Sequence, residues 1–95
     1  MALTIANTET GRIKVTGTTA TNQVIYGDYV GIKFVHWFKP SRGGHLCTLK
    51  DVNGVEIMEM NALADNDTQM WPVYKMVEGV YCDNMDSGTL YIYLR

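Results

Sequence analysis

The feature that most constrains the fold is a strict alternation of apolar and polar side chains near the end of the chain. Between positions 89 and 95, leucine or isoleucine occupies every second position, and the residues between them are threonine, two tyrosines and arginine. A β-strand turns successive side chains to opposite faces, whereas an amphipathic helix needs apolar residues three and four positions apart. We therefore expect a strand that packs its aliphatic side chains on a core and shows Tyr91, Tyr93 and Arg95 to the outside.

The remainder of the chain has the same character. Short runs rich in β-branched and aromatic residues alternate with clusters of Gly, Asn and Asp, and no long segment has helical spacing of apolar residues. The longest run, 29–38, carries Trp37, which we expect in the core. The pattern predicts an all-β fold, a single antiparallel β-sandwich (jelly-roll-like) of about seven or eight short strands, built as one domain over residues 1–95. The expected strands are 12–16, 24–26, 29–38, 45–50, 55–60, 69–74, 77–83 and 89–94.

Two connections between strands can be predicted. The segment 51–54, Asp-Val-Asn-Gly, fits a type I turn that closes with a left-handed glycine, so the runs on either side of it should form a hairpin. The segment 84–88 joins the last two expected strands, which we also expect to be a pair. A polar loop is expected at 18–22.

The charges and the start of the chain disfavour several classes of partner. The formal net charge is −2, and the lysines and arginines are scattered rather than clustered, so nucleic-acid binding is not expected. No run of apolar residues is long enough to cross a membrane. The first eight residues lack the basic and apolar regions of a signal peptide, so synthesis in the cytoplasm is expected.

No catalytic or metal-binding motif stands out, and we expect neither an enzyme nor a cofactor. His45 and Cys47 are the only closely spaced soft ligands, without the paired spacing of a zinc site. The loops rich in Asp and Asn could bind calcium, but these residues also make turns by bonding their own backbone. Cys47 and Cys82 are expected to be reduced, buried thiols, with a disulfide as the alternative.

Surface aromatic and methionine side chains favour contact with another protein. The expected interface consists of Tyr91, Tyr93 and Arg95 on the last strand, with Leu3 and Ile5 in a segment that could add to a neighbouring sheet edge. Met70 and Trp71 form a weaker patch. The alternative for the two tyrosines is that they pack against Trp37 or Tyr81 inside a second sheet. The chain is also expected to self-associate.

A carbohydrate-binding module is the alternative function, because aromatic rings can stack on sugars. Its best local match is Trp71 close to Asp65, Asn66 and Asp67, whose oxygens could bond hydroxyl groups. Such binding could depend on calcium.

Five segments of the chain form a pattern seen elsewhere: 32–37, 44–57, 64–67, 77–81 and the closing Asp-Ser-Gly-Thr-Leu-Tyr-Ile-Tyr-Leu at 86–94. In these segments the chain resembles small all-β proteins that tailed bacteriophages encode among their virion structural genes. The resemblance implies a non-enzymatic component of a phage particle, such as a capsid decoration, head-fibre or attachment protein, with other virion proteins as partners and the virion as its location. It carries over no catalytic residue.

Overall fold

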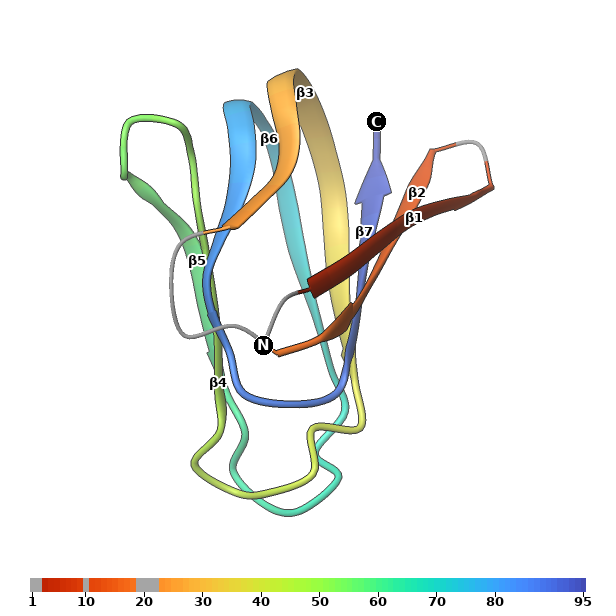
Figure 1. Cartoon of the computed structure of the whole chain (residues 1–95), viewed down its shortest axis with the longest axis vertical. Helices are drawn as coiled ribbons and strands as arrows, with labels where there is room; N and C mark the ends of the chain where they lie inside the picture. Colours follow the sequence, from red (N-terminus) through yellow and green to blue (C-terminus); the bar gives the residue numbers. More distant parts are fainter. Residues whose placement is uncertain (1–2, 10, 19–22) are drawn as a thin grey trace.

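The computed structural model describes residues 3–9, 11–18 and 23–95, and within these ranges it contains strands and turns but no helix. All strand pairs are antiparallel, and the strands form one sheet in the order β1-β2-β7-β3-β6-β4-β5 (Figure 1). The predicted all-β, antiparallel class is confirmed. The strands are β1 (Leu3–Glu9), β2 (Arg12–Gly17), β3 (Gln23–Phe38), β4 (Leu46–Lys50), β5 (Glu56–Asn61), β6 (Gln69–Met85) and β7 (Thr89–Leu94).

The sequence predicts two stacked sheets, whereas the structure has one sheet that bends over. The reason is the length of β3 and β6, which have 16 and 17 residues and run through the predicted breaks at 27–28 and 75–76. Strand β7 pairs with β3 only over 32–38, and β4 pairs with β6 only over 81–85. The sheet therefore has two halves that share β3 and β6. The β7 half contains β1, β2, β7, 30–38 and 69–77; the β4 half contains β4, β5, 23–29 and 78–85.

The bend falls where the pairing between β3 and β6 is irregular. The register shifts between Val24 and Tyr26 and again between Tyr26 and Tyr29, and such bulges increase the local bend and twist of a strand. On the facing strand, Gly79 has φ +80°, and a Cβ atom there would lie 3.2 Å from the carbonyl oxygen of Tyr26. The two halves thus curve towards each other around a shared interior (Figure 1).

The interior is a single apolar cluster with side chains from both halves. Val15, Val35 and Ile92 of the β7 half and Leu49 of the β4 half are all fully buried. Trp37 is also fully buried, as predicted, and its indole N–H donates a 2.9 Å hydrogen bond to the carbonyl oxygen of Ser87. The bond satisfies the one polar group that this large side chain brings into the core.

The predicted hairpin at 51–54 is confirmed. The carboxylate Oδ1 of Asp51 accepts the backbone N–H groups of Asn53 and Val55 at 2.9 and 3.0 Å. The N–H of Gly54 donates to the carbonyl oxygen of Asp51, and Gly54 has φ +79°. Strands β4 and β5 pair on either side of this turn.

The predicted pairing of the last two strands is wrong. Strand β7 pairs with β2 and β3 rather than with β6, so residues 86–88 cross from one half of the sheet to the other. Asp86 holds the start of this crossing: its carboxylate accepts the N–H of Leu46 at 2.8 Å, and its own N–H donates to the carbonyl oxygen of Leu46 at 3.1 Å. Of the predicted loop 18–22, all but Thr18 lies outside the described residues.

Both cysteines are free and buried, as predicted. Cys47 and Cys82 lie on the neighbouring strands β4 and β6 and share a hydrogen bond. This bond and burial raise the pKa of Cys47, while the same bond lowers the pKa of Cys82. The thiols fill the core as small apolar groups.

Candidate functional site

The outer surface of the β7 half carries five ring side chains, which we call the aromatic face: Phe34, His36 and Phe38 on β3, and Tyr91 and Tyr93 on β7. Phe34 lies opposite Tyr93 and His36 opposite Tyr91 in the antiparallel register. Side chains of opposed residues project from the same face of a sheet. Because Val35, Trp37 and Ile92 between them point into the core, these rings point outward.

The rings contact one another across the two strands and along β3. The centroids of Phe34 and Tyr93 are 4.3 Å apart with an angle of 25° between the ring planes. This separation is close to the spacing of about 4.8 Å between neighbouring strands, so the rings stack side by side along the sheet. His36 lies 6.0 Å from Tyr91 and meets Phe38 edge to face at 5.8 Å. One flat surface each of Phe34 and Tyr93 is therefore covered by the other ring.

Two cations lie over the remaining ring surfaces. The guanidinium carbon of Arg12 on β2 is 4.9 Å from the centroid of Tyr91 and 5.9 Å from that of Tyr93. The ammonium of Lys39 is 5.3 Å from the centroid of Phe38. Each contact is worth roughly 0.5–1 kcal/mol at an exposed site, and together they give the face a positive charge. Lys14, directly opposite Tyr91 on β2, adds to that charge.

Tyr91 and Tyr93 therefore pack against Phe34, His36 and Arg12, and both stay half-buried on the outside. They do not pack against Trp37 inside the core. Arg95 is exposed at the edge of the same face, where its N–H donates to the carbonyl oxygen of Gly31 at 3.0 Å. The predicted outward face of the last strand thus exists, although its use as an interface stays a prediction.

The two N-terminal residues of the predicted interface, Leu3 and Ile5, differ in how exposed their side chains are. The side chain of Leu3 is buried in the core, while its strand β1 lies at one edge of the sheet, so strand addition there stays a prediction. The backbone N–H and carbonyl of Leu3 also bond the side-chain amide of Gln23 at 2.9 and 3.2 Å, which ties β1 to the start of β3. Ile5 is exposed on β1, a strand at one edge of the sheet.

Met70 and Trp71 lie on opposite sides of the sheet, so they do not form one patch as predicted. Met70 is opposite His36 and borders the aromatic face, whereas Trp71 is opposite the buried Val35 at the open edge of β6. Proline at 72 and φ +47° at Tyr74 interrupt this edge. Both features hinder the addition of another strand, so the face is a better docking surface than the edge.

The acidic loops use their carboxylates to hold the backbone. Asp65 accepts the N–H of Gly43 at 3.1 Å, and Asp67 accepts the N–H of Leu63 and the side-chain amide of Gln69, each at 2.8 Å. The indole N–H of Trp71 donates to the same Gln69. Of the oxygens expected to bond a sugar beside Trp71, one carboxylate oxygen each of Asp65 and Asp67 is thus engaged within the loop. In the part of the chain that the structure describes, no group of His, Cys, Asp or Glu side chains could hold a metal ion.

The hydrogen bonds to Asp67 lower its pKa from the ordinary value of 3.8, first through the N–H of Leu63 and then through Gln69. Ionised Asp67 therefore stabilises the loop at neutral pH, and this contribution is lost as the pH falls through the lowered pKa. We expect Asp67→Asn to unfold at a lower temperature than wild type at pH 7, with the two midpoints converging as the pH falls below the lowered pKa of Asp67. Thermal unfolding across this range checks it. Glu56→Gln is the control, and a constant difference between Asp67→Asn and wild type at all pH values would contradict the prediction.

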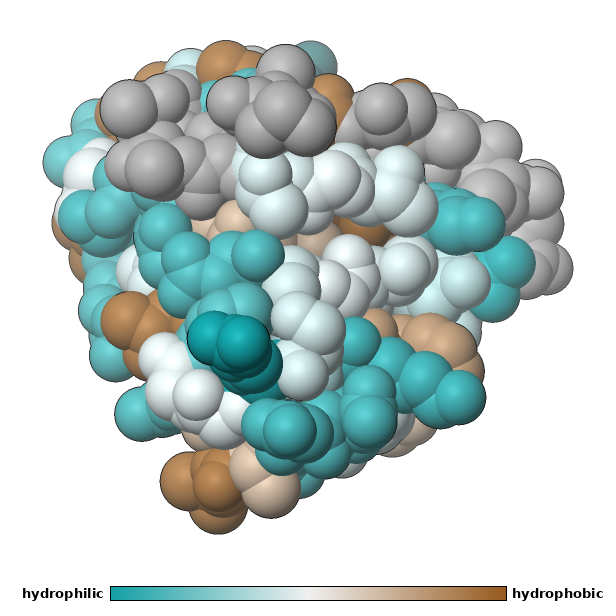
Figure 2. Space-filling model, turned by 60° about the horizontal axis from the view of Figure 1, so that its bottom comes forward, coloured by the Kyte–Doolittle hydropathy of each residue, from teal (hydrophilic) through white to brown (hydrophobic). Residues whose placement is uncertain are grey.

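The loops 39–45, 62–68 and 86–88 gather at one end of the molecule, at the bottom of Figure 1. Ser87 joins two of them, because its Oγ accepts the N–H of Ser41 at 2.9 Å and lies 2.7 Å from Nδ1 of His45. Figure 2 shows that the described surface in this view is mostly hydrophilic, with apolar residues in small, separate areas. The arrangement gives Ser87 a structural role and offers no broad docking surface at this end.

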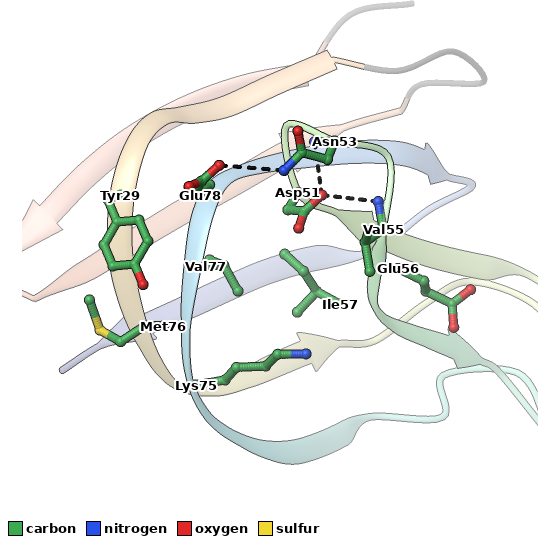
Figure 3. A pocket seen from close by; sticks show the side chains of 10 residues that line it. All are labelled: Tyr29, Asp51, Asn53, Val55, Glu56, Ile57, Lys75, Met76, Val77 and Glu78. Carbon is green, nitrogen blue, oxygen red and sulfur yellow. Dashed lines mark hydrogen bonds between the residues drawn. The ribbon is translucent and has the colours of Figure 1, made fainter.

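A shallow hollow of about 230 Å³ lies between the β4–β5 turn and β6 (Figure 3). Its wall is held by Glu78, which accepts a long 3.4 Å hydrogen bond from the amide of Asn53. Val77 and Ile57 supply apolar contacts, while Lys75 extends along one side (Figure 3). The hollow is open to solvent, and its charged side chains are Lys75 and the carboxylates of Asp51, Glu56 and Glu78.

A comparison of the chain with family models, with curated proteins and with solved structures found no match. The structure also contains no helix, among the residues it describes, that is long and apolar enough to cross a membrane. The aromatic face is therefore the principal guide to function. Sequence reasoning identified its two tyrosines but missed Phe34, His36 and Phe38, although these alternate with Val35 and Trp37 on β3.

Proposed function

We propose that this protein is a non-enzymatic structural module that docks on another protein through its aromatic face. The observation that carries the proposal is the row of five rings on the two central strands of the β7 half, flanked by Arg12, Lys14 and Lys39. Tyrosine, other aromatic side chains and arginine are the residues enriched at the centres of protein interfaces. Ring edges and aliphatic stems on this face can pack into a complementary protein surface.

The geometry of the rings favours a protein over a carbohydrate. A sugar ring stacks on an open aromatic surface, but Phe34 and Tyr93 already stack on each other, and Arg12 lies over Tyr91. The local match at Trp71 is weakened because Gln69 and Asp67 bond within the loop. A carbohydrate-binding module is therefore the lesser candidate.

We further propose that the module belongs to a bacteriophage particle, where it would occur in many copies beside other virion proteins. This part rests on the resemblance of the segments at 44–57 and 86–94 to small virion structural proteins. A docking face without enzymatic groups is the feature expected of such a component. The proposal places the protein in the virion after its synthesis in the host cytoplasm.

The experiment is sedimentation of phage particles from cells producing the phage that encodes the chain. We expect wild-type protein to band with intact particles in a density gradient, and we expect at least a tenfold lower amount in the particle band for Tyr91→Asp. Tyr29→Asp is the matched control, because Tyr29 is an exposed tyrosine outside the aromatic face. The thermal midpoint of each purified variant establishes that it is folded.

Two results would overturn the proposal. Wild-type protein that stays at the top of the gradient would exclude the particle, and Tyr91→Asp that bands as strongly as wild type would exclude the aromatic face. A blank glycan array, with and without calcium, would remove the carbohydrate alternative.

A further inference from the structure

The two halves of the bent sheet carry opposite charges. In the β7 half, strands β1, β2 and β7 with residues 30–38 and 69–77 contain four cations and one carboxylate, Glu9. In the β4 half, strands β4 and β5 with residues 23–29 and 78–85 contain one cation and five carboxylates. The formal charges are thus +3 and −4, although the whole chain carries only −2. The cations are Arg12, Lys14, Lys33 and Lys75, against Lys50 with Asp28, Glu56, Glu59, Glu78 and Asp83.

Lys75 of the β7 half lines the same hollow as Glu56 and Glu78, so it offsets part of the negative charge of the β4 half there. The one lysine of the β4 half, Lys50, lies 3.3 Å from the carboxylate of its neighbour Asp83, which leaves most of the negative charge of this half in place. Glu59 is exposed and accepts only the hydroxyl of Thr48 at 3.2 Å. Glu56 is exposed at the start of β5, the outermost strand of this half. The outer surface of the β4 half therefore presents an acidic face.

The two charged faces look away from each other. The apolar cluster lies between the halves, so the outer side of one half and the outer side of the other are on opposite sides of the molecule (Figure 1). One molecule cannot bring these faces together. A second copy can, by setting its acidic face on the aromatic face of the first. Pairing of two aromatic faces would instead oppose like charges, with Lys14 and Arg12 of each copy brought close together.

We propose that a second copy of this chain is the partner of the aromatic face, bound head to tail through the acidic outer side of β4 and β5. The inference rests on the proposed docking role of the aromatic face and names its occupant. Because the two surfaces differ, the contact is heterologous and leaves one free face of each kind on every dimer. Further copies can add at both ends, which yields a stack or a ring of many copies.

The aromatic and cationic character of the face also invites comparison with single-stranded nucleic acid, which binds sheets by stacking its bases on open rings. Here the stacked pair Phe34–Tyr93 and the guanidinium over Tyr91 occupy those surfaces. The acidic face on the other side of the chain would repel phosphates, whereas a second copy supplies both an acidic and an apolar surface. The second copy therefore fits better.

The test uses two charge variants of the full chain and measures mass by sedimentation velocity. Lys14→Glu with Lys39→Glu reverses the charge of the aromatic face, and Glu56→Gln with Glu59→Gln only neutralises the acidic face, so the two altered faces do not attract each other. Wild type is expected to exceed the mass of one chain at about 0.01 M ionic strength and to return to one chain at about 1 M, where the screening length falls from about 30 Å to about 3 Å. Each variant alone should be a monomer at low salt.

The decisive sample is an equal mixture of the two variants at low salt. Each variant keeps the face that the other lacks, so the mixture should form a dimer and nothing larger. A mixture that stays monomeric, or an acidic-face variant that keeps the mass of wild type, would overturn the proposal. A wild-type monomer that binds labelled oligothymidylate at low salt would also overturn it, in favour of nucleic acid. Neither result affects docking on particles, which the sedimentation of phage tests separately.

Discussion

Replacing Gly88 by alanine is expected to lower the free energy of unfolding by about 2–5 kcal/mol. Gly88 has φ +83°, a left-handed conformation that costs an L-residue roughly 1–2 kcal/mol. An added Cβ would also lie 2.9 Å from both the carbonyl oxygen of Phe38 and Nε1 of Trp37, and overpacking of this kind costs roughly 1–3 kcal/mol. The free energy of unfolding in urea, measured by tryptophan fluorescence, gives the difference directly.

Gly44→Ala is the matched control. Gly44 has φ +88°, but a Cβ there would meet no atom within 4 Å, so this variant carries the conformational cost without the collision. It should lose only about 1–2 kcal/mol. Equal losses for the two variants would show that Gly88 is required for its backbone angle alone. The close approach of residues 86–88 to the indole of Trp37 would then not contribute to the difference in the free energy of unfolding.

Local features of the fold could be predicted from the sequence because each depends on neighbouring residues. The turn at 51–54 is an example: Asp51 bonds two backbone N–H groups of its own turn, and Gly54 supplies the left-handed residue. The alternation at 89–94 likewise identifies both a strand and its buried face. Such patterns need no knowledge of the distant strands.

The sheet order could not be predicted, because it depends on contacts between distant residues. Gly27 and Asp28 ordinarily end a strand, yet here β3 continues through them as it bends from one half of the sheet to the other. Strand β7 then pairs with the far part of β3 rather than with its sequence neighbour β6. The sequence contains the glycines that permit the bend but nothing that selects the pairing.

The candidate site was predictable in part for the same reason. Period-2 alternation places Tyr91 and Tyr93 outward, so they could be named from β7 alone. Their partners Phe34 and His36 become part of the same face only through the register of β7 on β3. The burial of the Leu3 side chain was not predicted, because an apolar residue near a terminus can equally be an edge contact or a core side chain.

The separation of charge between the two halves also emerges only from the topology. Along the chain, cationic and acidic segments alternate, because β3 and β6 each pass through both halves. Lys33 and Asp28 are close in sequence on one strand but belong to opposite halves of the sheet. A near-neutral composition can therefore hide two surfaces of opposite sign, each suited to bind the other on a neighbouring molecule.

The core that holds these two faces apart depends most on Trp37. Trp37→Ala is expected to cost about 3–5 kcal/mol, because it removes the largest fully buried side chain and leaves the carbonyl oxygen of Ser87 without its indole donor. The loss is a large part of the roughly 5–15 kcal/mol by which domains are stable, so much of the variant should unfold near 37 °C. Urea unfolding followed by circular dichroism measures the loss without relying on tryptophan.

Trp71→Ala makes the same chemical change at a tryptophan that is 48% exposed at the open edge of β6. It should alter the free energy of unfolding by no more than about 0.5 kcal/mol, as surface substitutions usually do. Trp37→Phe separates the two contributions of the buried residue, since it keeps most of the apolar volume but loses the hydrogen bond, at a cost of roughly 1–3 kcal/mol. If Trp37→Ala lowered the free energy of unfolding no more than Trp71→Ala does, the two halves of the sheet could not be packed on the indole. The opposed faces on which self-association depends would then not be held in place by this core residue.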